Sequence, residues 1–529
     1  MNRHMSKRVL ITESLAEEGI ALLKEAAEVI VHLNPSPQEL LRLIPDCHAL
    51  VVRSSTAVTA EVFAAASRLV VVGRAGAGVD NIDLEAATRR GVVVVNAPTS
   101  NTIAVAEHTF ALMLSLARHI PQADASMHQS RWEKKALMGT ELRGKTLGLI
   151  GLGRVGAAVA QRAQAFEMHV IAHDPFVSPD RAARLNVELV GLEELLRRAD
   201  YVSLHAPATE RTRGMIGEQQ LALLKPTAYL INCARGDLIV EEALIRALRE
   251  GRIAGAALDV FADEPHITYD LCQCANLILT PHLGASTEEA QSGAAVQVAR
   301  QVIDVLEGRP PRHPVNVTAL SGEEMAFMMP YLDLTYRLGR FYAQFAENNL
   351  THIEVTYAGE PIEHDTALLT ASALAGLLSE GGQEPVNLVN ARLIAEERGL
   401  RVSEVRTSEA EGFAALITLR AETTRGEHLI SGTVVREEPH IVRIDRCWFD
   451  FVARGHLLVS EHLEQPGVIG QMGTILGEAG INISFVEVGR EARGGRGIMV
   501  VGVDEPIPSE AMVRIMTMPS IRAAHLVSL

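Results

Sequence analysis

Three residues in the middle of the chain have the chemistry needed to oxidise a secondary alcohol. Arg235, Glu264 and His282 each lie just after a short apolar run. Alcohol oxidation needs a base, and His282 can take the hydroxyl proton because the reference pKa of histidine lies near neutrality. A carboxylate such as Glu264 would stabilise the imidazolium and fix the tautomer of the ring. Arg235 carries a planar cation suited to a two-pronged grip on a carboxylate.

A glycine-rich motif provides the expected hydride acceptor. The buried-strand pattern of residues 146–150 is followed by Gly151, Gly153 and Gly156, and then by a helical pattern. This spacing permits a tight turn, a close approach of backbone to a pyrophosphate, and close packing of the helix on the strand. Asp174 ends the next strand, where it would bind the ribose hydroxyls and repel a 2′-phosphate. The motif therefore predicts an NAD site rather than an NADP site.

Parallel strands would bring these segments together. We expect β-strands at 9–12, 29–32, 49–52, 69–72 and 92–96, and again at 146–150, 170–173, 201–204, 229–233, 255–259 and 277–280. Such continuous apolar runs alternating with helical patterns indicate parallel sheets covered on both faces, that is, an α/β fold with two Rossmann-like doubly wound domains. Ligands of such sheets bind beyond the carboxyl ends of the strands, which is where the three candidate catalytic residues lie.

Composition narrows the class of protein further. The 529 residues are enough for three or four domains, and acidic residues outnumber basic ones by 65 to 49, which argues against nucleic acid as a partner. No stretch is apolar enough for a secretory signal or a membrane span, so we expect no membrane contact. Five scattered cysteines favour reduced thiols in the cytoplasm. Cys272 and Cys274 have no second pair or histidine cluster beside them, so we expect no metal.

The last two hundred residues follow a different pattern. Residues 308–314 are rich in Pro and Gly and indicate a linker. An amphipathic helix follows, with Leu334, Leu338, Phe341 and Phe345 on one face. Residues 456–529 follow the order strand, helix, strand, strand, helix, strand.

Four segments resemble the signatures of the D-2-hydroxyacid dehydrogenase family. They are GLGRVG, LLKPTAYLINCARGDLI, ALDVFADEP and TPHLGAST. The resemblance implies that Arg235, Glu264 and His282 are catalytic. It also implies an NAD site lined by Ala77, Gly151, Gly153, Arg154, Val155, Gly156, Asp174, Ala206, Cys233, Ala234, Asp259, His282, Leu283, Gly284 and Ala285. Asp259 is better placed to touch the nicotinamide end than to transfer a proton.

The segments RSSTAVT and GRAGAGVDNID are similar to those of family members that oxidise 3-phospho-D-glycerate with NAD in serine synthesis. By this resemblance the substrate contacts are Arg53, Ser54, Arg74 and Gly76. Lys134 or Lys135 from a partner subunit would add a cation for the phosphate.

The tail is similar to that of the long-form members of this family. Residues 331–360 resemble their α+β intervening domain, and the last segment resembles a βαββαβ ACT domain. The implied domains are 1–98 with 283–316 for substrate (flavodoxin-like), 99–282 for NAD, 317–454 intervening and 455–529 ACT. ACT domains commonly pair and bind an amino acid, so a homo-oligomer (dimer or tetramer) and an L-serine effector site at Glu464, Pro466, Gly467 and Asn482 are implied. Glu464 stands where serine-binding versions often have Asp, and its extra methylene would move the carboxylate away from the ligand amine.

Two alternatives remain open at this point. In the first, the chain is a non-catalytic NAD-sensing regulator, like the co-repressors of the family. In the second, it is a reductase that acts on another substrate, such as 2-oxoglutarate. The acidic charge and the ACT-like tail disfavour the regulator. Phosphate and carboxylate groups seek the same cations, so the substrate needs a direct assay.

Overall fold

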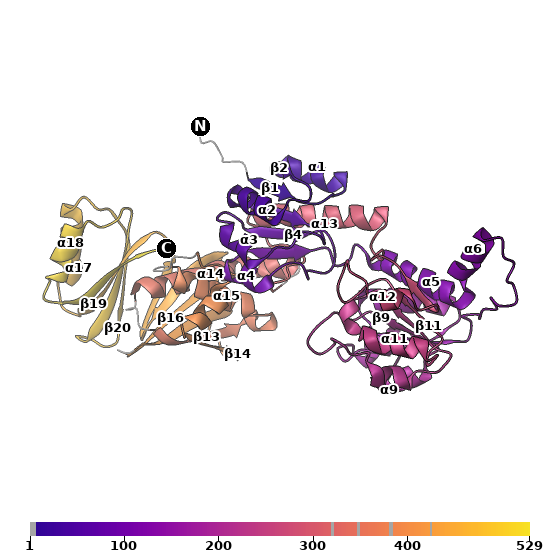
Figure 1. The fold of residues 1–529 in the computed structure, drawn as a ribbon. Coiled ribbons are helices and arrows are strands. Elements are labelled where there is room, and N and C mark those ends of the chain that lie inside the picture. Colours follow the sequence, from indigo (N-terminus) through magenta and orange to yellow (C-terminus); the bar gives the residue numbers. More distant parts are fainter. Residues whose placement is uncertain (1–6, 319–321, 346–349, 380–384, 424–425) are drawn as a thin grey trace.

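The computed structural model describes residues 7–318, 322–345, 350–379, 385–423 and 426–529. These residues form four separate β-sheets, two of them parallel (Figure 1). The predicted α/β class, with two Rossmann-like sheets followed by an α+β unit and a βαββαβ unit, is confirmed.

The first sheet is five-stranded and parallel, in the flavodoxin-like order β2-β1-β3-β4-β5. Its strands are β1 (Arg8–Ile11), β2 (Glu28–Val31), β3 (Ala49–Val52), β4 (Val71–Arg74) and β5 (Val93–Asn96). One face is covered by α2 (Pro37–Leu43), η1 (Ile44–Asp46), α3 (Ala60–Ala65) and α4 (Leu84–Arg89), and the other by α1 (Glu17–Ala26) and α13 (Glu288–Leu306). We call this sheet and its helices the first lobe; α13 joins it from much later in the chain.

The second sheet is seven-stranded and parallel, in the order β12-β11-β10-β9-β6-β7-β8. Its strands are β6 (Thr146–Ile150), β7 (His169–His173), β8 (Glu188–Leu189), β9 (Tyr201–Leu204), β10 (Tyr229–Asn232), β11 (Gly255–Leu258) and β12 (Leu277–Leu279). The strand order reverses between β6 and β9, and this switch point is where open parallel sheets bind ligands. We call this sheet and its helices the second lobe.

Helices cover both faces of the second sheet, as the continuous apolar strands require. α5 (Thr102–Arg118), α7 (Arg154–Ala165) and α8 (Pro179–Arg184) pack on one face, and α9 (Leu192–Arg198), α10 (Glu218–Leu223), α11 (Glu241–Arg249) and α12 (Tyr269–Cys272) on the other. A short turn of helix, η2 (Gly236–Leu238), follows β10. α6 (Ile120–His128) projects away from the body of the lobe (Figure 1).

The structure corrects two sequence-based details. The two-residue strand β8 was not predicted, because two residues are too few to show a pattern. The segment predicted as a linker does not simply span a gap, because Pro314 bridges to Val95 and the amide of Val315 donates to the carbonyl of Val94 at 2.7 Å. The end of this segment therefore completes the edge of the first sheet.

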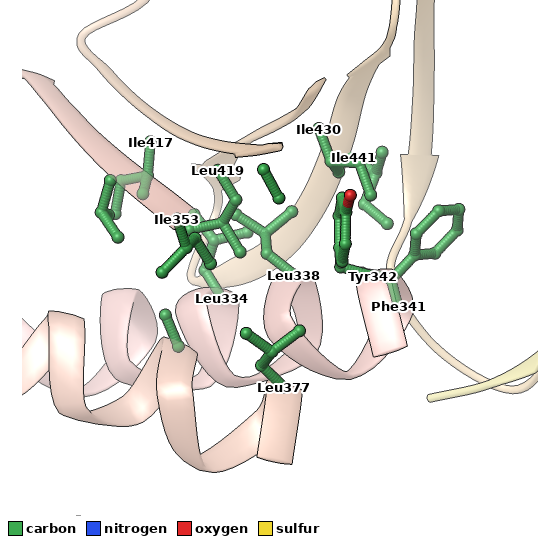
Figure 2. Packing of buried hydrophobic residues seen from close by; sticks show 14 of the residues in the cluster. Leu334, Leu338, Phe341, Tyr342, Ile353, Leu377, Ile417, Leu419, Ile430 and Ile441 are labelled. Carbon is green, nitrogen blue, oxygen red and sulfur yellow. The ribbon is translucent and has the colours of Figure 1, made fainter. Parts of the chain in front are cut away.

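The third sheet is mixed, in the order β14-β13-β15-β16-β17-β18, with only β13 and β14 parallel. Its strands are β13 (Leu350–Gly359), β14 (Arg401–Thr407), β15 (Ala415–Thr423), β16 (Gly426–Val435), β17 (Glu438–Ile444) and β18 (Cys447–Val452). The accompanying helices are α14 (Gly322–Phe345), η3 (Glu360–Glu363), α15 (Ala367–Leu378) and α16 (Ala391–Glu397). The predicted apolar face of α14 is buried, and Figure 2 shows Leu334 and Leu338 directed at the strands.

The fourth sheet is antiparallel, in the order β20-β21-β19-β22. It contains β19 (His456–Leu463), β20 (Ile483–Arg490), β21 (Arg496–Val503) and β22 (Ile521–Ser528). One face is covered by α17 (Val468–Glu478) and α18 (Ser509–Met516). Leu457, Val459 and Val500 on the other face join the same buried cluster as α14 and β18, so the third and fourth sheets share a core.

Candidate active site

The glycine motif lies at the switch point of the second sheet, between β6 and the first turn of α7. Gly151 has a φ of 98°, and a Cβ there would lie 2.6 Å from the carbonyl oxygen of His205. A Cβ on Gly156 would lie 2.2 Å from the carbonyl oxygen of Gly151, so the close packing of helix on loop requires glycine at both positions. Gly153, by contrast, faces open space, and no side chain of the described chain caps the helix it precedes. An uncapped helix N-terminus beside an open glycine fits a pyrophosphate.

Asp174, at the end of β7, braces this loop. Its carboxylate oxygens accept hydrogen bonds from the backbone amides of Leu152 at 2.8 Å and Phe176 at 2.9 Å. Each carboxylate oxygen has two lone pairs, so capacity for two ribose hydroxyls is left. The neighbouring residues Arg154 and Val155 open α7, and Ala206 follows β9 on the opposite side of the switch point.

The three candidate catalytic residues follow three neighbouring strands, β10, β11 and β12. Nδ1 of His282 lies 2.7 Å from Oε2 of Glu264, and the other oxygen of Glu264 accepts from the amide of Phe261 at 3.0 Å. The His282 side chain is about half exposed and Glu264 about one third exposed. The structure therefore forms the predicted histidine–carboxylate pair, with Nε2 of His282 left for a substrate.

Arg235 reaches from the second lobe to the first. Its Nε lies 3.1 Å from Oδ2 of Asp80, and its Nη1 donates to the carbonyl of Ala234 at 2.7 Å. A Cβ on Gly78 would lie 2.1 Å from Nη2 of Arg235, so the guanidinium rests against the glycine-rich loop of the first lobe. This contact brings Arg235 to the loop in which Arg74, Gly76 and Ala77 were predicted to bind ligands.

Asp259 is fully buried, and its carboxylate accepts hydrogen bonds from four sides. The donors are the amides of Leu283 at 2.7 Å and Gly284 at 2.8 Å and the hydroxyl of Thr280 at 2.7 Å, and Nε2 of His108 lies 3.2 Å away. Although burial raises its pKa, these bonds from His108, Thr280 and Leu283 hold the pKa of Asp259 below its ordinary value. Asp259 therefore fixes the turn that carries His282, and its contact with nicotinamide stays a prediction.

The predicted substrate residues lie at the carboxyl ends of β3 and β4. Arg53 and Ser54 follow β3, and Arg74 ends β4 with its Nη1 close to where a Cβ of Gly76 would be, at 2.5 Å. Burial, and then the nearby Arg235, lower the pKa of Arg74. Arg53 also acts electrostatically on Arg74. The guanidinium of Arg53 donates to the carbonyl of Ser14 at 3.3 Å. Lys134 and Lys135 are exposed in the segment after α6, away from these residues in sequence.

Other predicted cofactor residues occupy the same edge of the second sheet. Cys233 and Ala234 follow β10, and burial raises the pKa of the Cys233 thiol to about 12, which makes it an inert apolar neighbour. Leu283, Gly284 and Ala285 form the turn held by Asp259. The carbonyl of Ala77, in the first lobe, accepts from Nδ2 of Asn96 at 2.6 Å.

The structure does not bring the four predicted effector residues together: Glu464, Pro466 and Gly467 lie at the start of α17, whereas Asn482, just before β20, lies at the opposite end of the fourth sheet. Gly467 has a φ of 95° and begins the helix, just after Pro466. The carboxylate of Glu464 is engaged by Nη1 of Arg490 and by the amide of Gly494 at 2.6 Å. Asn482 donates to Oδ2 of Asp504 at 2.6 Å. Both polar side chains thus have partners within the fourth-sheet unit.

Sequence reasoning missed several residues that shape the site. His108, Asp80 and Thr280 belong to it by contact. Asp80 and Thr280 lie within the segments GRAGAGVDNID and TPHLGAST but were given no role from the sequence, and Asp80 and His108 are far along the chain from their partners Arg235 and Thr280. Among the described residues, no group of three or more His, Cys, Asp or Glu side chains is arranged to hold a metal ion. Nor is any described helix both long and apolar enough to span a bilayer.

Comparison with known proteins supports the signatures in three separate regions. Residues 110–284 match the model of the NAD binding domain of D-isomer specific 2-hydroxyacid dehydrogenases. Residues 327–445 match the D-3-phosphoglycerate dehydrogenase intervening domain, and residues 456–515 match the ACT domain.

Relatives match the chain over its whole length. The D-3-phosphoglycerate dehydrogenase of Methanocaldococcus jannaschii is 43% identical over 99% of this chain and 100% of its own. That of Synechocystis sp. is also 43% identical, over 99% of this chain and 95% of its own. The chain belongs to the D-3-phosphoglycerate dehydrogenase family. The Bacillus subtilis member is 39% identical over 99% of both chains, so the match includes the tail.

Solved structures of other proteins are similar to somewhat more than half of the chain. The TT0316 protein from Thermus thermophilus is 38% identical, with a TM-score of 0.55, and covers 58% of this chain and 99% of its own. The D-lactate dehydrogenase from Aquifex aeolicus, solved with NAD and lactic acid, is 28% identical, with a TM-score of 0.52 over 57% of this chain and 96% of its own.

Proposed function

We propose that the chain oxidises 3-phospho-D-glycerate to 3-phosphohydroxypyruvate with NAD, the first step of L-serine biosynthesis. The observation that carries this function is the full-length identity of about 43% to D-3-phosphoglycerate dehydrogenases. The 2.7 Å contact between His282 and Glu264, beside a glycine loop that fits a pyrophosphate, supports it from the structure.

The residues of the site suggest how the proton moves. Because Glu264 contacts Nδ1 of His282, the carboxylate favours the tautomer with a proton on Nδ1 and a lone pair on Nε2. Nε2 then takes the proton of the substrate hydroxyl, and Glu264 stabilises the imidazolium that forms. Bound NAD supplies the acceptor for the hydride from carbon 2.

Cations from both lobes suggest how the substrate is held. Arg235 would grip the carboxylate beside the reacting carbon, and Arg53 and Arg74 would bind the phosphate. Burial and then the positive charge of Arg235 lower the pKa of Arg74, and a substrate with several negative charges would offset the repulsion between these cations.

An absorbance assay for NADH with 3-phospho-D-glycerate tests the function directly. A panel with D-glycerate, D-lactate and 2-oxoglutarate, the last assayed in the direction of reduction, reveals any other substrate. We expect 3-phospho-D-glycerate to have the highest kcat/KM. A different leading substrate would contradict the proposal, as would NADH binding without turnover.

We further propose four domains: residues 1–98 with 283–316 for substrate, 99–282 for NAD, 317–454 as the intervening domain and 455–529 as the ACT domain. The four sheets and the packing of α13 on the first sheet support this division. A cytoplasmic location is part of the proposal, supported by five cysteines that are all free thiols in the described chain.

A homo-oligomer and an L-serine effector complete the proposal. Trp132 and Met138, both in the segment after α6, are 80% and 82% exposed, and an interface between two copies of the chain would cover such apolar side chains. The match of residues 456–515 to the ACT domain supports a regulatory amino acid at the interface of paired ACT domains, with Glu464, Pro466, Gly467 and Asn482 as the proposed contacts. The bonds of Glu464 to Arg490 and Gly494 would have to compete with a ligand amine.

A further inference from the structure

The loop after β3, residues 53–56, presents Arg53 and Ser54, and we call it the substrate loop. Glu13, two residues past the end of β1, is 7% exposed and directs its carboxylate at this loop. The carboxylate accepts backbone amides from Arg53 at 2.8 Å, Thr56 at 3.0 Å and Ser55 at 3.1 Å. Burial raises the pKa of Glu13, but these bonds outweigh burial and bring the pKa below its ordinary value. Glu13 therefore stays ionised and ties down three of the four amides of the loop.

Asn81 binds backbone carbonyls of the same loop, whereas Glu13 binds its backbone amides. Its Nδ2 donates to the carbonyl of Arg53 at 2.9 Å and to that of Thr56 at 2.7 Å. Its Oδ1 accepts from Nε of Arg74 at 2.9 Å. One side-chain amide thus joins the substrate loop to the guanidinium of the neighbouring strand, using both of its N–H groups and its oxygen.

We call Glu13 and Asn81, with their bonds to the substrate loop and to Arg74, the clamp. The clamp opposes the electrostatic repulsion between neighbouring arginines. Burial is the main cause that lowers the pKa of Arg74, but Arg235 and then Arg53 lower it further, so these cations repel one another and would tend to separate. The clamp fixes Arg74 through Nε and the substrate loop through its backbone. This leaves the terminal nitrogens of Arg74 outside the clamp for a ligand.

We infer that Glu13 and Asn81 are positioning residues that set the preference for a phosphorylated over an unphosphorylated 2-hydroxy acid. This inference rests on the proposed function, in which Arg53 and Arg74 bind the phosphate. Neither Glu13 nor Asn81 needs to touch the substrate. Each acts by fixing the loop backbone from which Arg53 extends relative to the guanidinium of Arg74, because a phosphate contacted by both side chains requires one fixed geometry.

The kinetic test compares 3-phospho-D-glycerate with D-glycerate in Asn81→Ala, Glu13→Gln and the control Glu17→Gln. Glu17 is an exposed carboxylate in the first turn of α1, close to Glu13 in sequence. Hydrogen bonds to charged groups contribute enough that we expect KM for the phosphorylated substrate to rise roughly tenfold or more in Asn81→Ala. KM for D-glycerate, kcat and the Kd of NADH should each stay within about threefold of the parent, because the substitution weakens only the contacts with the phosphate group.

Equal losses for both substrates, or a KM for 3-phospho-D-glycerate no different from that of Glu17→Gln, would overturn the inference. Amide hydrogen exchange of the substrate loop gives a readout that needs no activity. We expect faster exchange at residues 53, 55 and 56 in Glu13→Gln, with β4 unchanged. Unchanged exchange there would refute the clamp itself. A parent that turns over D-glycerate but not 3-phospho-D-glycerate would instead refute the proposed function.

Discussion

At the scale of single residues, the site concentrates strain at His282. Its backbone has a φ of 54°, in the left-handed region that residues other than glycine rarely adopt. The amide of His282 lies within hydrogen-bond distance of the carbonyls of Asp259 and Thr280, and the next two amides donate to the carboxylate of Asp259. The buried carboxylate thus holds a turn that directs the ring of His282 at Glu264.

The first residue-scale prediction concerns His282→Ala. We expect kcat to fall by about 10²–10⁴, because the substrate hydroxyl loses its general base. NADH binding should remain measurable, since the glycine loop is untouched. Steady-state rates and NADH fluorescence titration measure the two effects. His266→Ala, which removes a largely exposed histidine of the same region, is the control. Activity of His282→Ala within a few-fold of the parent would refute the assignment.

Asp174→Ala tests the choice of cofactor. The substitution removes the proposed acceptor for the ribose hydroxyls and the negative charge that we expect to repel a 2′-phosphate. It also frees the amide of Leu152 in the glycine loop. We expect NAD to bind more weakly and its advantage over NADP to narrow, as measured by kcat/KM for each cofactor. Asp180→Ala, at the first turn of α8, is the control. A parent that already prefers NADP would contradict this account.

Motif residues could be predicted from sequence, whereas their partners could not. Gly151, Asp174 and His282 stand directly after apolar runs, so local patterns place them at the ends of strands. Asp80 and Arg235 are 155 positions apart, and no local pattern links them. His108 contacts Thr280 across 172 positions, on the face of a helix whose apolar spacing says nothing about that contact. Such pairs depend on how the elements pack.

At the scale of elements, buried strands could be predicted from the sequence, whereas a segment held by polar bonds could not. The central strands of the first two sheets are short, mostly buried runs rich in Val, Ile, Leu and Ala, and this signal is strong, whereas the edge strands β2, β8 and β12 are partly exposed. The segment at residues 313–316 has no such signal, because Asn316 is held by side-chain bonds to Val94 and Val92 rather than by apolar packing. Whether a polar segment pairs in this way depends on the strand that lies beside it, so the sequence of the segment alone does not predict the pairing.

Helix α5 provides the element-scale prediction. His108 on α5 contacts Asp259 and Thr280, so it ties this helix to the ends of β11 and β12. Asp259→Ala would leave the amide of Gly284, the hydroxyl of Thr280 and other donors without their acceptor. Buried groups without partners cost about 1–3 kcal/mol each, so we expect the thermal midpoint to fall by roughly 5 °C or more. His108→Ala removes only the two contacts made by Nε2 of His108 and leaves the other donors to Asp259 in place, so it should cost less. Equal thermal midpoints for Asp259→Ala and the parent would show that the turn is stable without the hydrogen bonds to Asp259.

At the scale of the whole molecule, the third- and fourth-sheet units are joined by charge as well as by their shared core. Asp445, at the end of β17, lies 3.3 Å from Nδ1 of His428 and 3.6 Å from Nη2 of Arg496, which also pairs with Glu461 at 2.8 Å. The hydrogen bond to Asp445 raises the pKa of His428, although burial opposes the shift. The network therefore links the two units across β16, β17, β19 and β21.

This network predicts how stability depends on pH. Because the pKa of His428 is raised by folding, its contribution is fully present below the unfolded value of about 6.5 and is lost as the pH rises through the folded pKa. As the pH rises from below 6.5 through the folded pKa of His428, we expect the thermal midpoint of the third- and fourth-sheet units to fall by roughly 2–5 °C in the parent. The fall should be smaller in His428→Gln. Calorimetry at several pH values measures it, with His266→Gln as control. Identical slopes in the parent and His428→Gln would exclude this contribution.

The last prediction concerns truncation after Val317. Asn316 must be kept, because its side chain bonds to Val94, Val92 and Thr88 at the edge of the first sheet. Every proposed catalytic residue precedes this point, so we expect the shortened chain to fold, bind NAD and retain some activity.

The lost contacts set the other expectations. Removing the tail frees Arg89 from Glu397 and the carbonyl of Gly91 from Asn387, both near the exposed end of α4, so the cost to the first lobe should be small. We expect the shortened chain to sediment as a smaller assembly than the parent, a dimer joined around residues 102–119. It should also lose any response to L-serine, since Glu464 and Asn482 are gone. Titration of both proteins with L-serine, during activity and sedimentation measurements, checks this. Equal inhibition of both would place the effector site outside the tail, whereas inhibition of neither would mean that the ACT domain serves assembly or binds another ligand.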